Sequence, residues 1–67
     1  MKTCVFEKVR IERRVSQQEV AVSMGLSLTA YRNKEKGRSK FFVDEVPAFC
    51  EAVGIELKEM VKIIFLD

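Results

Sequence analysis

Residues 16–37 combine capping residues, apolar spacing and glycines that together predict two short helices joined by a tight turn. Ser16 is a preferred N-cap residue, and Glu19, three positions later, completes a capping box. Gly25 ends the first helix, because only glycine enters the left-handed conformation there without a steric cost. Ser27 caps a second helix, which we expect to run from residue 28 to about residue 36 and to stop at Gly37.

Two small residues favour a close crossing of these helices. Ala21 and Gly25 are four positions apart, so they lie on the same side of the first helix. A second helix that crosses the first at about 90–120° needs small groups where the backbones approach. We expect the space between the helices to be filled by Val20, Met24, Leu26 and Tyr31. The N-cap residues, the two small residues and the glycine turn all occur at the spacing that a helix-turn-helix unit requires. The segment therefore predicts this unit, with which many proteins place a helix in the DNA major groove.

The residues on either side of this unit predict a further helix and a loop. A helix that precedes the helix-turn-helix unit is expected from residue 3 or 4 to residue 13. Its apolar stripe is Val5, Phe6 and Val9. Val15, just before the Ser16 cap, is placed to act as a hydrophobic staple. Residues 37–43 form a loop that we expect Phe41 and Phe42 to anchor to the core.

The C-terminal third predicts two more helices. One starts near Asp44, has Pro47 in its first turn, where the missing N–H costs little, and ends at Gly54. Its buried face comprises Val46, Phe49, Cys50 and Val53. The last helix starts near Glu56 and carries Leu57, Met60, Val61 and Ile64. Phe65 and Leu66 either continue this helix or leave it, and residues 63–66 either close the core or form a dimer contact. The sequence therefore predicts one all-α domain, residues 1–67, of five short helices.

Composition narrows the functional classes. With 48% hydrophobic and 33% charged residues, the chain is globular, and without a signal peptide or a long apolar run we expect a cytoplasmic protein with no membrane contact. Cys4 and Cys50 stand in apolar helical patterns and are expected to be buried free thiols. No histidine is present, and neither a glycine-rich phosphate loop nor a cluster of metal ligands occurs. We therefore expect no enzyme activity, cofactor, metal or small-molecule ligand.

Charge is unevenly distributed along the chain. Residues 1–40 contain ten of the twelve lysines and arginines and four acids, whereas residues 41–67 contain two lysines and six acids. One part of the molecule is therefore basic and another acidic. A local basic surface is what phosphate neutralisation requires, although charge alone is equally compatible with a solvated face that binds nothing.

Several stretches carry a family resemblance: residues 15–21 (VSQQEVA), 24–27 (MGLS), 31–41 (YRNKEKGRSKF) and 52–60 (AVGIELKEM). They are similar to the phage repressor and Cro-like helix-turn-helix regulators, also called XRE-type or lambda-repressor-like, over about residues 6–61. The resemblance implies a compact five-helix fold with the helix-turn-helix as its second and third helices. It also implies a double-stranded DNA partner and a bacterial cytoplasm, with the chain encoded by the cell, a phage or a mobile element.

Three positions depart from that family's pattern. Lys34 stands where most members have an apolar residue, and we expect its stem to cover the core while the ammonium reaches water. Arg14 replaces a glycine or asparagine between the first two helices. Phe42 occupies a cap position, which moves the expected start of the fourth helix to Asp44.

Candidate DNA contacts lie on the second helix of the unit and on the loop after it. The residues expected to reach base edges are Leu28, Thr29, Arg32 and Asn33. Arginine can donate two hydrogen bonds to guanine, and asparagine can pair with adenine. Leu28 either meets a thymine methyl or packs the helix start. Phosphate contacts are expected from Ser27, Lys36, Arg38, Ser39 and Lys40.

The resemblance adds Gln17 as a further phosphate contact, at a helix N-terminus that favours anions. It also implies that Arg10 pairs with Glu35 and lies near a phosphate; the alternative is two unrelated surface charges. The leading hypothesis is a sequence-specific transcriptional regulator; a homodimer would double its DNA contacts, and the sequence leaves the oligomeric state open. The alternative is a protein-interaction module that keeps the scaffold without specific DNA binding.

Overall fold

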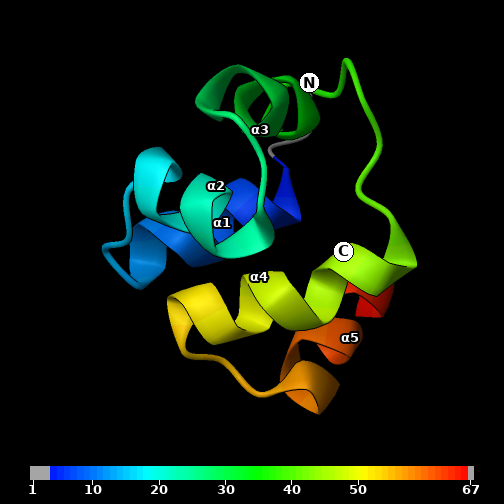
Figure 1. The fold of residues 1–67 in the computed structure, drawn as a ribbon. Coiled ribbons are helices and arrows are strands. Elements are labelled where there is room, and N and C mark those ends of the chain that lie inside the picture. The colour runs from blue at the N-terminus through cyan, green and yellow to red at the C-terminus, as the bar shows by residue number, and fades with distance from the viewer. Residues whose placement is uncertain (1–3, 67) are drawn as a thin grey trace.

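Five α-helices and one 3₁₀ turn make up residues 4–66, the part of the chain that the computed structural model describes (Figure 1). The elements are α1 (Val5–Glu12), α2 (Gln17–Met24), α3 (Leu28–Glu35), η1 (Val43–Glu45), α4 (Val46–Val53) and α5 (Leu57–Leu66). Residues 4–66 contain no strand, so the predicted all-α class is confirmed. The ends of the predicted domain, and the earlier of the two expected starts of the first helix, fall on residues 1–3 and 67, outside the described residues.

The predicted caps and turn between α2 and α3 are present. The Ser16 Oγ accepts a hydrogen bond from the Glu19 N–H at 3.1 Å, and the Glu19 carboxylate accepts one from the Ser16 N–H at 3.5 Å, which is the capping box. Gly25 has φ +70°, and the Leu26 N–H then donates to the Ala21 carbonyl at 2.8 Å. These hydrogen bonds pair backbone groups at both ends of α2. The turn at Gly25 then leads the chain into α3.

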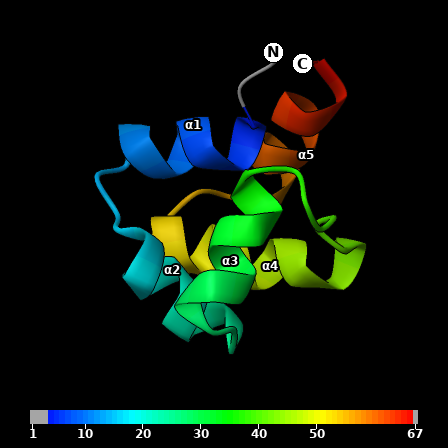
Figure 2. The ribbon, with the colours of Figure 1, turned by 90° about the horizontal axis from the view of Figure 1, so that it is seen from above.

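The core lies where α2 packs against both α3 and α4. Its largest fully buried side chains are Tyr31, Phe49, Met60 and Val20. Ala21, the small residue predicted for the close approach of α2, is also fully buried. Met24 and Leu26, expected in the same space, are partly buried against this core. Figure 1 shows α3 at one end of the molecule and α4 and α5 at the other, and Figure 2, seen from the α3 end, shows α3 nearest the viewer.

The aromatic residues of the predicted loop behave differently from each other. Phe41 stacks on Phe6 with ring centroids 3.8 Å apart and meets Tyr31 and Phe49 edge-on, so it anchors the loop as predicted. The prediction for Phe42 is wrong, because this side chain is 60% exposed. Phe42 instead lies with its ring 4.6 Å from the ammonium of Lys34. Of the two aromatic rings, only that of Phe41 packs on the core.

The start of α4 also differs from the prediction. Asp44 belongs to η1, and α4 itself begins at Val46, with Pro47 in its first turn as expected. The Glu45 side chain accepts a hydrogen bond from the Phe42 N–H at 2.8 Å, and this bond stabilises a separate 3₁₀ turn ahead of α4. At the other end of the chain, Phe65 and Leu66 continue α5, which answers the alternative left open by the sequence.

Two further expectations are answered in part. Cys50 is a buried free thiol, and its burial raises the pKa of that thiol, whereas Cys4 is only half-buried at the N-cap of α1. Arg14, the departure between α1 and α2, adopts φ +58°, which is the left-handed conformation that glycine or asparagine takes more easily. No helix among the described residues is long and apolar enough to cross a membrane.

Candidate nucleic-acid interface

A single buried carboxylate joins the first three helices. Both oxygens of Glu35, at the end of α3, accept a hydrogen bond from Arg10 of α1: Nε donates to Oε2 at 2.6 Å and Nη2 to Oε1 at 3.3 Å. The Tyr31 hydroxyl donates to Oε2 at 2.6 Å, and the Gln17 amide donates to Oε1 at 2.8 Å. The pair of Arg10 with Glu35 is therefore confirmed, within a larger cluster that also ties down the start of α2.

The cluster keeps the carboxylate ionised. Burial would raise the pKa of Glu35, but the hydrogen bonds from Arg10, Tyr31 and Gln17 outweigh it and hold that pKa below its ordinary value. The hydrogen bond with Glu35 raises the pKa of Arg10. Burial, followed by the hydrogen bond to Glu35, raises the pKa of the Tyr31 hydroxyl far above its ordinary value. At neutral pH the cluster therefore has one negative and one positive charge; Arg10, Tyr31 and Gln17 all donate to the carboxylate, and Arg10 Nη1 also donates to the Val15 carbonyl at 3.0 Å.

Acid should weaken the fold through this cluster. The pKa of Glu35 is lower in the folded than in the unfolded chain, so its contribution is fully present above the ordinary value of 4.5 and disappears as pH falls through the folded pKa. We expect the urea midpoint to be nearly constant from pH 7 to about pH 5 and to fall below that. Arg10→Met/Glu35→Gln, which removes both charges of the pair together, should flatten this part of the profile; an equally steep profile in that variant would contradict the assignment. Urea titrations followed by circular dichroism at several pH values measure the effect.

Gln17 connects the buried cluster to the exposed side of α3. Its amide nitrogen donates to Glu35, and its amide oxygen accepts from the Arg32 Nε at 3.1 Å. The arginine is exposed, yet one of its five N–H groups is bound, and its two terminal nitrogens have no hydrogen-bond partner among residues 4–66. The Gln17 side chain, which was expected to contact a phosphate, thus forms both of these hydrogen bonds within the protein.

The candidate base-reading residues are exposed to different degrees. Thr29 and Arg32 are exposed on α3, whereas Leu28 and Asn33 are half-buried. Ser27 caps α3, because its Oγ accepts a hydrogen bond from the Ala30 N–H at 3.1 Å. The outward face of α3 is thus narrower than expected and is centred on one threonine and one arginine.

The loop after α3 presents a run of exposed polar and basic side chains. These are Lys36, Arg38, Ser39 and Lys40. The Asn33 carbonyl accepts hydrogen bonds from the N–H groups of Arg38 at 2.9 Å and Ser39 at 3.2 Å, and Gly37 turns the chain with φ +81°. Four expected phosphate-binding residues therefore lie next to the end of α3 and close in sequence to Arg32. Arg10 differs from them, because its side chain is only 12% exposed and three of its hydrogen bonds are internal.

Lys34 is the residue whose environment the sequence did not reveal. The ammonium, expected in water, is buried: it donates to the Lys40 carbonyl at 2.8 Å and to the Glu45 carboxylate at 2.9 Å. Burial would raise the pKa of Glu45, but the Phe42 N–H and the Lys34 ammonium together lower it. An apolar-type position three residues after Tyr31 indicates burial, but nothing local identifies a carboxylate eleven residues away as the partner.

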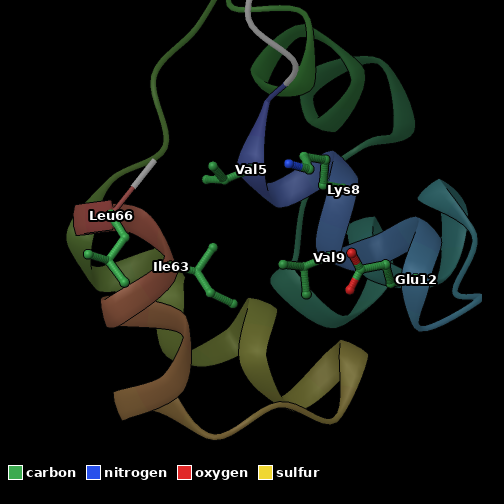
Figure 3. A pocket seen from close by; sticks show the side chains of 6 residues that line it. All are labelled: Val5, Lys8, Val9, Glu12, Ile63 and Leu66. Atoms are coloured by element: carbon green, nitrogen blue, oxygen red, sulfur yellow. The ribbon is translucent and has the colours of Figure 1, made fainter.

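Three hollows on the surface lie away from α3. One, of about 280 Å³, lies between α1 and the end of α5 and is lined by Val5, Lys8, Val9, Glu12, Ile63 and Leu66 (Figure 3). A second, of about 390 Å³, lies along α4 and the segment that joins it to α5. The third, of about 420 Å³, is an apolar groove lined by Val43, Val46, Pro47, Leu57, Val61, Ile64 and Phe65. None of these hollows includes a residue of α2 or α3 in its lining.

Comparison of the chain with protein-family models, with curated proteins and with solved structures gave no match. The function of the chain is therefore inferred from its own geometry and from the resemblance described from its sequence.

Proposed function

We propose that this protein is a sequence-specific DNA-binding transcriptional regulator with a lambda-repressor-like arrangement, in which α2 and α3 form the helix-turn-helix and α3 enters the major groove. The observation that carries the proposal is the tethering of Arg32. Its Nε is bound by Gln17, which is in turn bound by the buried Glu35. An exposed arginine held on a buried framework, beside a loop of cationic side chains, is an arrangement suited to reading a polyanion.

The tether supports a specific role for Arg32. With Nε bound to Gln17, its two terminal nitrogens are the donors that would form the paired hydrogen bonds to O6 and N7 of guanine. Thr29, exposed one turn earlier, would meet a neighbouring base or phosphate. The half-buried Asn33 and Leu28 would contribute at the edges of this contact, an adenine for the amide and a thymine methyl for the leucine.

Phosphate contacts in this proposal come from the loop and from the helix starts. Lys36, Arg38, Ser39 and Lys40 would follow one DNA strand, and Ser27 would face the other side of the groove. Each phosphate neutralised would steepen the dependence of log K on log salt by about 0.9. The side chains of Gln17 and Arg10 would position α3 from within, because both are bound to Glu35.

The natural partner for the apolar groove at the other end of the molecule is a second copy of the chain. Phe65 and Val43, at its edges, are 83% and 89% exposed, so projecting side chains and a groove occur on one surface, as a self-complementary two-fold interface requires. A typical interface buries about 800 Å² per partner, about one sixth of the 4807 Å² of exposed surface. A dimer would present two copies of α3 to a two-fold symmetric operator.

Charge at the groove edges also favours self-association. Lys62 is exposed on α5, three residues before Phe65, whereas Asp44 is exposed in η1, next to Val43. A two-fold axis that runs along the groove would bring each basic edge opposite the partner's acidic edge. Such complementarity opposes the wrong register and speeds encounter.

Phe65→Asp should therefore abolish the dimer. A charge placed in the apolar interface should raise the dissociation constant at least 30-fold, which corresponds to the roughly 2 kcal/mol of a hot-spot residue. Sedimentation equilibrium measures the change, and Ile11→Asp serves as the matched control, because Ile11 is 58% exposed on α1 outside the groove. A monomeric wild type at high micromolar concentration, or equal losses in both variants, would reject this interface.

Binding to a pool of random duplexes, with selection and sequencing at two salt concentrations, tests the proposed function. The wild type should enrich a short two-fold symmetric motif, and the Arg32→Ala/Asn33→Ala variant should lose that enrichment. Salt-dependent binding without enrichment would mean phosphate attraction alone. No binding at low salt would reject the regulator and favour the alternative, a protein-interaction module on the same scaffold.

A further inference from the structure

The loop that follows α3 is fastened to that helix at both of its ends. At the start of the loop, the Asn33 carbonyl accepts the Arg38 and Ser39 N–H groups at 2.9 and 3.2 Å. At the end of the loop, the Lys34 ammonium donates to the Lys40 carbonyl at 2.8 Å. Two consecutive residues of α3 therefore hold the whole turn, one through its backbone and one through its side chain.

The Lys34 ammonium binds the segment that follows α3 at several points. Besides the Lys40 carbonyl, it binds the Glu45 Oε1 at 2.9 Å, and the same oxygen accepts the Phe42 N–H at 2.8 Å. The Phe42 ring lies 4.6 Å from the ammonium, within the range of a cation–π contact. One buried charge thus joins the last residues of the loop, the exposed aromatic ring and the η1 turn.

Stability alone does not account for a charge at this position. A buried ion pair is often no more stabilising than apolar side chains of similar volume, because both charges must be removed from water. Lys34 lies on the inward side of α3, one turn after Tyr31, where an unbranched apolar side chain of the same length would also fill the space. What an apolar side chain lacks is the ability to bind the Lys40 carbonyl and the Glu45 carboxylate at once.

We propose that Lys34 is a positioning residue that orders the loop of residues 38–42 and so directs Arg38, Ser39 and Lys40 at DNA phosphates. The role in phosphate binding rests on the proposed function, whereas the ordering of the loop is a property of the free protein. Lys34 itself touches no DNA in this scheme, since its side chain is 7% exposed. It acts through the backbone of Lys40 and through Glu45.

The test replaces Lys34 by methionine, alone and together with Glu45→Gln, so that the double variant leaves no unpaired, partly buried carboxylate. Lys8→Met is the matched control, because it removes an exposed lysine of α1 that lines the hollow between α1 and α5. Affinity for the selected duplex should fall about tenfold in both Lys34 variants, and the salt slope should fall by about 0.9 for each phosphate that the loop no longer binds. The ratio of affinities for the selected and a scrambled duplex should stay near that of the wild type, because phosphate contacts do not read sequence.

A second measurement in the free protein separates this proposal from the proposed function. Heteronuclear relaxation of the amides of residues 38–42, and hydrogen exchange of the Phe42 N–H, should show a more mobile loop in the Lys34 variants while α1–α5 stay ordered. Unchanged loop dynamics, an unchanged salt slope, or a loss of sequence discrimination equal to the loss of affinity would overturn the positioning role. A wild type that binds no DNA would overturn the proposed function and the phosphate role together, and the loop dynamics would still decide whether Lys34 orders the loop.

Discussion

Arg10→Ala should lower the free energy of unfolding by about 3–5 kcal/mol, the loss expected when one partner of a buried ion pair is removed. The Glu35 carboxylate is 1% exposed, and without the guanidinium it would keep only the Tyr31 hydroxyl and the Gln17 amide as donors. A core of this size supplies roughly 3–5 kcal/mol of net stability. The variant should therefore be close to its unfolding midpoint at 25 °C even without urea.

Urea titrations followed by circular dichroism measure this loss, and Arg13→Ala provides the matched control. Arg13 is also an arginine near the end of α1, but its ion pair with Glu59 spans 3.8 Å between half-exposed and exposed side chains. Such a pair contributes about 0–1 kcal/mol. Similar midpoints for the two variants would contradict the central role of the buried pair. Arg10→Lys should recover only part of the loss, because an ammonium does not form the two parallel hydrogen bonds of a guanidinium.

The second large effect is expected in DNA binding. Under the proposed function, Arg32→Ala should weaken binding to the selected duplex by roughly 5- to 150-fold, which corresponds to the 1–3 kcal/mol of a bidentate contact with guanine. Gln17→Ala should produce part of the same loss without removing any proposed base contact, because it frees the Arg32 Nε and lets the side chain sample more rotamers. Both variants should lose discrimination at the same base pair.

Arg38→Ala serves as a control that separates the loss of a base contact from the loss of one positive charge. Its side chain is exposed on the loop, so its removal costs the same positive charge as Arg32→Ala. The expected result is weaker binding to selected and scrambled duplexes alike, with a salt slope reduced by about 0.9. If Arg32→Ala behaved in the same way, α3 would contribute only phosphate attraction and the assignment of Arg32 as a base-reading residue would be wrong. Fluorescence anisotropy at three salt concentrations gives both quantities.

The features that were predicted correctly from the sequence are those with local causes. The capping box of Ser16 and Glu19 and the left-handed glycine at position 25 act within a few residues, so their residue types and spacing are sufficient evidence. Apolar spacing likewise identified the buried residues Phe6, Phe49 and Met60. The 3₁₀ turn was missed because it depends on one side chain, that of Glu45, which hydrogen-bonds to Phe42 and to Lys34 at once.

The candidate site could be predicted only in outline for a related reason. Which residues lie on α3 and on its loop follows from spacing, but what holds them depends on partners distant in the chain. Arg32 meets Gln17 across 15 residues and Lys34 meets Glu45 across 11, so neither contact has a local signature. Polar side chains such as Gln17 and Lys34 were therefore expected to point outward, and only the three-dimensional arrangement reveals that they serve as internal partners.

One side of α3 packs into the interior of the protein, and the other side is exposed to solvent. Tyr31, Lys34 and Glu35 face the interior, whereas Thr29 and Arg32 face solvent. Substitution of Thr29 leaves the partners of Glu35 untouched, and substitution of Arg32 removes one hydrogen bond to Gln17 but none to Glu35 itself. Surface changes of that kind usually alter stability by no more than about 0.5 kcal/mol. The helix can therefore accumulate new outward side chains without unfolding, and under the proposed function a change of DNA target is separable from maintenance of the scaffold.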